Sequence, residues 1–235
     1  MNPVTFYESE SRKGSPGPRL ILAHGAGAPA DSAFMERLAS ALSEEGVRTL
    51  RFEFPYMEKR RLDGRKRPPD RQPVLLEHFR RVIDEIAAEA AAGGPIFIGG
   101  KSMGGRMASH IIAQGDLPPD VSGAVCFGYP FHPPGKHERW RTIHFQDLQR
   151  PLQIIQGSRD PFGRRSEVEA RGLETVDNLN LSWLEGGDHD YRPLARQQQS
   201  QEAMILRAAS LAAAFIHGYA RASRATPVRV EQWND

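Results

Sequence analysis

Short apolar runs alternate with amphipathic helical patterns along the chain, and this alternation constrains the fold more than any other feature of the sequence. Several of the runs are apolar at consecutive positions, which is typical of parallel strands buried on both faces. The pattern predicts an α/β fold with a mostly parallel central sheet and helices on both faces. The runs expected as strands are RLILAHG (19–25), VRTLRFEF (47–54), PIFIGG (95–100), SGAVCFG (122–128), PLQIIQG (151–157) and LNLSWLEG (179–186).

Helical periodicity fills the intervals between these runs. Apolar residues three or four positions apart share one helix face in three stretches: Phe34, Leu38 and Leu42; Leu75, Phe79, Val82 and Ile86; Met103, Met107 and Ile111. A last helix is expected from about Gln201 to Gly218, followed by an irregular tail over 219–235. We see no internal repeat and no linker, so one domain over 1–235 is expected, with its core at about 15–218.

Composition excludes several classes of function. The 31 Lys and Arg residues against 29 Asp and Glu residues give a net charge of +2, so no chain-wide nucleic-acid or membrane partner is indicated. The start of the chain lacks a signal-peptide pattern, and no apolar run approaches the roughly 20 residues of a membrane span. We therefore expect a cytoplasmic location. The single cysteine, Cys126, excludes an intrachain disulfide and a cysteine-based metal cluster.

The stretch IGGKSMGG, residues 98–105, fits two chemistries that both use a glycine-rich turn. A phosphate-binding loop GxxxxGK[ST] needs glycine at position 95, where the chain has Pro95. Read as G-x-S-x-G, residues 100–104 place Ser102 at a sharp turn from strand to helix. The flanking glycines would let the strand and the helix approach each other closely. This interpretation makes Ser102 a candidate nucleophile.

A serine nucleophile needs a base and a group that orients the base. Asp160 follows the strand at 151–157, and His189 follows the strand at 179–186. The order serine, acid, histidine is that of the α/β-hydrolase architecture, with all three residues at the carboxyl edge of the sheet. We expect His189 to contact the Ser102 hydroxyl and Asp160 to hold the other ring nitrogen. Asp188 and Asp190 flank the histidine and are weaker candidates for the acid.

Acyl transfer also needs backbone donors for the developing oxyanion. The N–H of Met103 follows the nucleophile directly, and the HGAGAP loop, residues 24–29, follows an early strand. In that loop the N–H of Ala26 is the first choice and that of Gly27 the second. His24 is expected to brace the loop rather than to act as the base.

Five blocks of the chain resemble, in order, those of a small, lidless α/β-hydrolase family: LILAHGAG, FEFPYMEKRRLDGRKRPPDR, GGKSMGGRMAS, GYPFHPPGK and QGSRDPFG. That family is related to the dienelactone hydrolases, and it includes an animal testis-expressed protein and a subunit of the NSL histone-acetyltransferase complex. The resemblance covers about residues 15–218 and implies an α/β-hydrolase fold with a minimal lid or none. It also implies that Ser102, Asp160 and His189 are the catalytic triad.

Two segments carry further candidates. Residues 131–144 follow a strand and are expected at the rim of the site, as a proline-ordered loop that partly covers the pocket. His132, His137 and His144 lack a usual ligand spacing there, so neither a metal nor a cofactor is expected. Residues 57–72 concentrate basic side chains after the strand at 47–54. Because arginine pairs well with carboxylate and phosphate groups, we expect Arg60, Arg61 and Arg67 to recruit a substrate with an anionic group.

Together these features predict a serine hydrolase that acts on an ester or a related activated acyl bond of a small molecule. A catalytically idle interaction module and an acyltransferase are the alternatives. The sequence leaves the substrate and the oligomeric state open.

Overall fold

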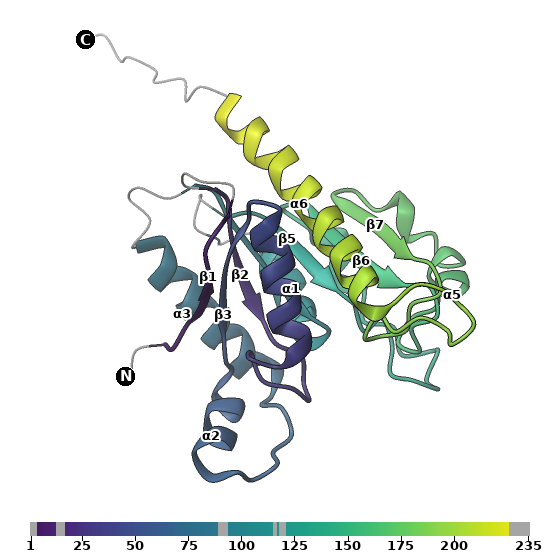
Figure 1. Ribbon diagram of the computed structural model, residues 1–235, viewed down its shortest axis with the longest axis horizontal. Helices are drawn as coiled ribbons and strands as arrows, with labels where there is room; N and C mark the ends of the chain where they lie inside the picture. The colour runs from purple at the N-terminus through teal and green to yellow at the C-terminus, as the bar shows by residue number, and fades with distance from the viewer. Residues whose placement is uncertain (1–3, 13–16, 89–93, 115–116, 118–120, 226–235) are drawn as a thin grey trace.

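The computed structural model describes residues 4–12, 17–88, 94–114, 117 and 121–225, and its centre is a seven-stranded sheet (Figure 1). The strand order is β1-β3-β2-β4-β5-β6-β7. Neighbouring strands pair in parallel except β1, which runs antiparallel to β3. The strands are β1 (Tyr7–Ser9), β2 (Arg19–Ala23), β3 (Arg48–Phe52), β4 (Ile96–Lys101), β5 (Val121–Phe127), β6 (Leu152–Gly157) and β7 (Leu179–Leu184). The predicted mostly parallel sheet is confirmed.

Both faces of the sheet are buried, which explains why the strands are apolar at consecutive positions. In β2, Leu20 and Leu22 pack with α1 (Ala33–Glu44) and α6 (Gln201–Ala225). Ile21 and Ala23 belong to the opposite core, with α3 (Gln72–Ala88) and α4 (Met103–Ile112). Figure 1 shows α1 and α6 side by side over the viewer's face of the sheet. The predicted helical faces are those that pack on the sheet.

Three elements differ from the sequence-based prediction. Strand β1 was missed, because three residues at a sheet edge carry little periodicity. Part of the basic segment is helical as α2 (Pro55–Asp63), which begins with proline and ends at Gly64 in the left-handed conformation. Helix α6 continues to Ala225, so the irregular tail expected from residue 219 is wrong as far as 225. The remainder of that tail, 226–235, lies outside the described residues. The short elements are α5 (Arg165–Glu169) and the 3-10 turns η1 (Ile143–Asp147) and η2 (Leu173–Thr175).

Helix α6 contradicts the expectation that no apolar stretch approaches the length of a membrane span. Its residues Gln201–Arg221 are long and apolar enough to cross a membrane by length and composition, with a mean hydropathy of 1.3. The same helix is a core element here, since alanines and isoleucines along one face pack against the sheet and α1. The alanine-rich face of α6 accounts both for its apolar composition and for its packing in the core.

The strand order places a crevice beside β2. Strand β3 lies on one side of β2 and β4 lies on the other. The order in which successive strands join the sheet therefore reverses at β2. In open α/β sheets, ligands bind at the carboxyl ends of strands at such a switch point. The loops that leave β2 and β4, which carry Ala26 and Ser102, meet there.

Buried neutral histidines couple the stability of the fold to pH. Burial, together with the nearby His110 and Arg106, lowers the pKa of His144 to about 3. Its Nε2 contacts Ser109 Oγ at 2.8 Å, and the same oxygen contacts the Arg106 carbonyl at 2.8 Å. Because the hydroxyl donates to the carbonyl, Nε2 carries the ring proton. His144 Nδ1 is buried and without a hydrogen-bond partner in the described part of the chain, so a second proton there would be costly.

We expect the free energy of unfolding to fall as the pH falls from about 6.5 toward 4. The folded-state pKa lies below the unfolded value, so the unfolded chain binds more protons in this window. His144 alone contributes a slope of up to about 1.4 kcal/mol per pH unit. Urea unfolding of wild type and His144→Gln across this range measures the effect, because glutamine keeps a donor for Ser109 but does not titrate. Equal slopes for the two proteins would contradict it.

Candidate active site

Ser102 stands at a strained turn between β4 and α4. Its backbone has φ 52 and ψ −112, a conformation that is costly for a residue with a side chain. Two features hold it: the Ser102 N–H donates to the Phe127 carbonyl at 3.0 Å, and the glycines around it allow close packing. A Cβ on Gly104 would lie 2.5 Å from the carbonyl oxygen of Ala23, and one on Gly100 would meet the same atom. The glycine spacing seen in the sequence is therefore required by this turn.

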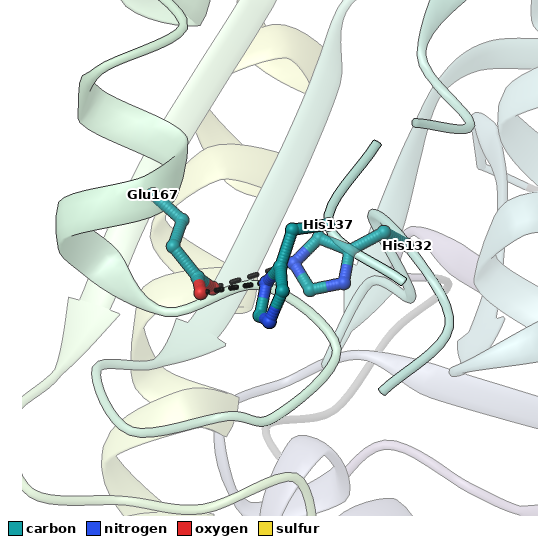
Figure 2. A group of neighbouring side chains, drawn as sticks. All are labelled: His132, His137 and Glu167. Atoms are coloured by element: carbon teal, nitrogen blue, oxygen red, sulfur yellow. Dashed lines mark hydrogen bonds and ion pairs between the residues drawn. The ribbon is translucent and has the colours of Figure 1, made fainter. Parts of the chain in front are cut away.

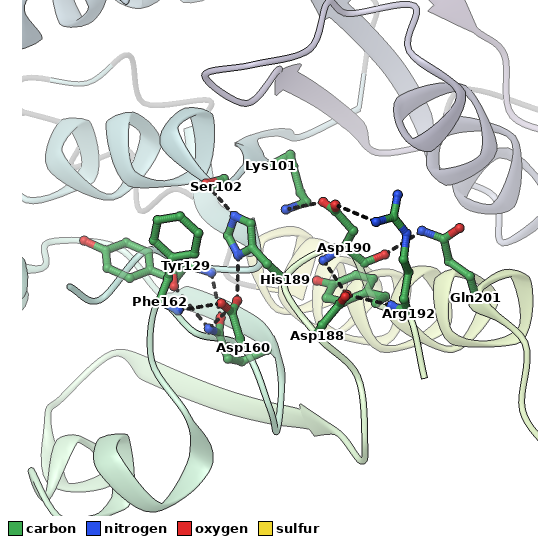
Figure 3. A network of polar contacts seen from close by, with 12 residues as sticks. Lys101, Ser102, Tyr129, Asp160, Phe162, Asp188, His189, Asp190, Arg192 and Gln201 are labelled. Atoms are coloured by element: carbon green, nitrogen blue, oxygen red, sulfur yellow. Dashed lines mark hydrogen bonds and ion pairs between the residues drawn. The ribbon is translucent and has the colours of Figure 1, made fainter. Parts of the chain in front are cut away.

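The structure brings together Ser102, His189 and Asp160, as the sequence predicted (Figure 3). His189 Nε2 lies 2.8 Å from Ser102 Oγ, and His189 Nδ1 lies 2.7 Å from Asp160 Oδ2. An ionised carboxylate only accepts hydrogen bonds, so Nδ1 carries the proton and Nε2 is the acceptor for the serine hydroxyl. The neutral ring is thus in the tautomer that takes the serine proton.

Asp160 is fully buried and is held by three donors. Besides His189, the side-chain amide of Gln156 donates to Oδ2 at 2.8 Å, and the Phe162 N–H donates to Oδ1 at 2.8 Å. The other two carboxylates near the histidine are engaged elsewhere. Asp188 accepts the backbone N–H groups of Asp190 and Arg192, and Asp190 faces Lys101. The sequence had no signal for Gln156, which comes from β6 and faces the acid.

The loop after β2 is braced from behind by side chains that hold its carbonyl groups. The Phe54 N–H donates to His24 Nε2 at 3.1 Å, so Nδ1 carries the ring proton and donates to the Gly25 carbonyl at 2.6 Å. The Tyr56 hydroxyl donates to the Ala26 carbonyl at 3.0 Å. In a trans peptide the next N–H points the opposite way, so the N–H groups of Ala26 and Gly27 point away from these braces. The structural role predicted for His24 is confirmed.

The Met103 amide directly follows Ser102 in the chain. Met103 is the first residue of α4, and the first N–H groups of a helix have no acceptor within the helix. Ser102 supplies no side-chain cap for them. Ala26 lines the cavity together with Ser102, whereas Met103 follows Ser102 in the chain and is not among the residues that line the cavity.

The basic segment does not reach the cavity beside Ser102. Arg60 donates to the Gly27 carbonyl at 3.2 Å and so adds a third brace to the loop. Arg61 pairs with Glu53 at 2.6 Å and with Asp31, and these contacts raise the pKa of the guanidinium. Arg67 pairs with Asp63 and lowers the pKa of that carboxyl to about 2. The structure thus does not bring Arg60, Arg61 and Arg67 to the cavity, because acceptors within the chain already hold their side chains.

A cavity of about 330 Å³ opens at Ser102 and His189. Its remaining walls come from the loop after β2, the start of α1, Lys101 and the loops after β6 and β7: Gly25, Ala26, Gly27, Ala28, Ser32, Phe34, Met35, Lys101, Phe162 and Asp190. The Phe162 ring packs 4.4 Å from the His189 ring. No part of 131–144 lines the cavity among the described residues, so the prediction that this segment covers the pocket is wrong. Phe131 of this segment is instead buried in the hydrophobic core on the face of the sheet that α3 and α4 cover.

Lys101 is a wall residue that the sequence interpretation missed. Its side chain is 8% exposed, and its Nζ lies 3.5 Å from Asp190 Oδ1 and 5.4 Å from the centre of the Phe34 ring. Burial lowers the pKa of the ammonium, and Asp190 opposes this effect. The available signal was a lysine at the end of an otherwise apolar strand.

A mostly parallel sheet with a serine turn after a central strand, and with a histidine and an acid on later loops, defines the α/β-hydrolase class. The chain belongs to the alpha/beta hydrolase domain family, whose model matches residues 16–217. No lid is evident in the described residues.

Solved structures share this fold at low sequence identity. Dienelactone hydrolase from Anabaena variabilis superposes with a TM-score of 0.68 at 19% identity, over 92% of this chain and 98% of that one. Est1E from Butyrivibrio proteoclasticus gives 0.67 at 15% identity, over 92% and 95%. An alpha-beta serine hydrolase homologue from Coxiella burnetii gives 0.66 at 16% identity, over 91% and 97%. At this level of identity these neighbours show that the chain shares their fold and nothing more.

Proposed function

We propose that the protein is a serine hydrolase that cleaves an ester or a related activated acyl bond through an acyl-enzyme. The observation that carries the proposal is the chain of contacts from Ser102 Oγ through His189 to Asp160, at 2.8 and 2.7 Å, which opens on the cavity. A serine held in a strained turn has no evident packing purpose, whereas a nucleophile gains exposure from it.

In the proposed reaction, Ser102 Oγ attacks the acyl carbon while its proton passes to His189 Nε2. Asp160 stabilises the imidazolium, and the N–H groups of Ala26 and Met103 stabilise the oxyanion of the tetrahedral intermediate. The intermediate expels the alcohol, which takes the proton from Nε2, and leaves an acyl group on Ser102. Water then attacks the acyl-enzyme with His189 as base, and the products are a carboxylic acid and the free serine. No cofactor takes part in these steps.

We infer a small-molecule substrate from the size of the cavity. A volume of about 330 Å³ lies at the lower end of the range of small-molecule sites, and Phe34, Met35 and Phe162 supply apolar wall. One neighbouring structure holds ferulic acid bound to Est1E, and another is a dienelactone hydrolase, so compact carboxyl compounds are reasonable first substrates. An anionic group on the substrate would meet Lys101 rather than the arginines of 57–72.

The finer family assignment remains part of the proposal. The FPYM and HPPGK blocks favour the group that contains the testis-expressed protein and the NSL complex subunit. Membership of that group leaves room for an idle interaction module, and an acyl-enzyme is also the intermediate of an acyltransferase. Labelling of the serine separates the first alternative from catalysis. Product analysis with and without an alcohol acceptor separates the second.

The test is covalent labelling by a fluorophosphonate probe, which reacts with activated serines. Wild type is expected to gain one adduct, on the peptide that contains Ser102, and Ser102→Ala is expected to gain none. Ser109→Ala is the matched control, because Ser109 lies in the same helix and should not affect labelling. A folded wild-type protein that takes up no probe would favour the idle module.

A further inference from the structure

Two histidines from the segment after β5, His132 and His137, meet Glu167 from α5 (Figure 2). His132 Nε2 lies 3.3 Å from Glu167 Oε2, and His137 Nδ1 lies 3.0 Å from Glu167 Oε1. One ligand atom from each of the three residues lies within 4.8 Å of the others. None of the three lines the cavity at Ser102. The cluster is therefore separate from the site described above.

The turn Pro133-Pro134-Gly135-Lys136 brings the two histidines together. The Lys136 N–H donates to the Pro133 carbonyl at 3.0 Å, and Gly135 has φ +73, as the third position of a type II turn requires. The chain reverses, and the His137 ring lies 4.9 Å from that of His132. The sequence prediction of no metal rested on spacing, but this turn and the distant Glu167 make spacing uninformative.

As a neutral ring, His132 cannot form hydrogen bonds with both of the oxygen atoms that face its two nitrogens. Its side chain is fully buried, and both ring nitrogens face acceptors: Nδ1 lies 3.0 Å from the Pro133 carbonyl and Nε2 faces the glutamate. A neutral imidazole has one N–H and cannot donate to both. In the neutral ring, a proton on Nδ1 leaves the Nε2 lone pair directed at a carboxylate oxygen, and either a second proton on the ring or a metal cation between the two atoms relieves this repulsion.

The three groups have the geometry and chemistry of ligands for a zinc-class ion. Ligands at 2.0–2.1 Å from a tetrahedral Zn²⁺ lie roughly 3.3 Å apart. The two histidine–glutamate separations, 3.3 and 3.0 Å to different carboxylate oxygens, are close to this value, and one ligand atom from each residue lies within 4.8 Å of the others. Imidazole and carboxylate together favour zinc over magnesium or calcium, which prefer oxygen alone. The Nδ1–H of His132 held by a backbone carbonyl is also the arrangement that orients a metal-bound histidine.

We propose that His132, His137 and Glu167 bind one divalent zinc-class cation. The His137 side is open, since that side chain is 60% exposed, and water completes the coordination there. The ion ties the segment after β5 to helix α5. The backbone N–H of His132 also donates to the Phe162 carbonyl at 3.0 Å, so the ion braces the loop that carries Asp160. The role is structural and does not depend on the proposed hydrolase activity.

The test uses full-length protein without a histidine tag, stripped with EDTA and dialysed. Titration calorimetry with ZnCl₂ near neutral pH is expected to show one equivalent bound, and Co²⁺ is expected to give the visible bands of a tetrahedral site. His137→Asn and Glu167→Gln should each weaken Zn²⁺ binding at least about tenfold. At a free Zn²⁺ concentration 100 times Kd, the folding equilibrium of wild type should shift about 100-fold toward the folded state.

Two controls separate this site from adventitious binding. Glu169→Gln changes a carboxylate on the same helix, and His217→Asn changes a histidine on α6 that contacts the Glu45 carbonyl. Both should bind Zn²⁺ as wild type does. The proposal is overturned if wild type binds no equivalent of Zn²⁺, or if His137→Asn and Glu167→Gln bind it as tightly as the controls. Circular dichroism establishes that each variant is folded. Because the His137 side chain is exposed, its replacement should not disturb the fold.

Discussion

Replacement of His189 by alanine is expected to lower kcat for an activated ester such as p-nitrophenyl acetate by roughly 10⁴- to 10⁶-fold. His189 Nε2 lies 2.8 Å from Ser102 Oγ and, in the proposed mechanism, is the base that makes the hydroxyl nucleophilic. Without it the serine proton has no acceptor in place. The loss should fall on kcat with a small change in KM, because the ring contributes little to ground-state binding.

A double variant tests the His189 prediction further, because the effects of replacing residues that act together do not add. Residues that act as one unit lose activity together, so Ser102→Ala combined with His189→Ala should be no slower than either single variant. His217→Asn is the control, since that ring lies on α6 away from the cavity. A His189→Ala protein that keeps a tenth of wild-type activity would remove His189 from the mechanism.

Asp160→Asn is expected to lower kcat by about 10⁴-fold while leaving the fold intact. An asparagine amide presents a donor as well as an acceptor, so the His189 ring can turn its lone pair toward residue 160 and its N–H toward Ser102. The serine then faces a donor instead of a base. The Phe162 N–H would still donate to the carbonyl oxygen of the new side chain in the Oδ1 position, whereas the Gln156 amide, which donates to Oδ2, would lose its acceptor there.

Asp188→Asn and Asp190→Asn are the matched controls for that variant. Both residues flank His189 in sequence, but Asp188 caps a turn and Asp190 faces Lys101. Their replacement should change kcat by tenfold or less. If Asp188→Asn or Asp190→Asn were as slow as Asp160→Asn, the acid would be misassigned. Measured stabilities should accompany the kinetics, because a buried acid also supports the loop.

The sheet was predictable because its strands have a strong local signal. Parallel strands buried on both faces, such as Leu20–Ala23, are continuous apolar runs, and no other element of this length reads the same way. Helix α2 was not predictable, because only Tyr56 and Met57 are buried and most of its other residues are charged. Its helix depends on Pro55, Gly64 and ion pairs whose partners lie elsewhere in the chain.

The three residues around the Ser102 hydroxyl were predictable because each directly follows a strand, and parallel strands end at one edge of the sheet. The neighbours that hold them were not. Arg60 looked like a ligand for an external anion, since no sequence pattern reveals that the Gly27 carbonyl lies within its reach. His132 and Glu167 are 35 positions apart, and their contact depends on how the segment after β5 meets α5.

The order of the strands also fixes when the site can come into existence. Ser102 follows β4, Asp160 follows β6, and His189 follows β7, which forms the edge of the sheet opposite β1. A growing polypeptide on the ribosome thus holds the serine long before it holds the base. Because β7 pairs only after β6 is in place, the proposed hydrolase activity would become available only after β7 and the loop that carries His189 have been added, and activity measured during refolding would report completion of the sheet's last edge.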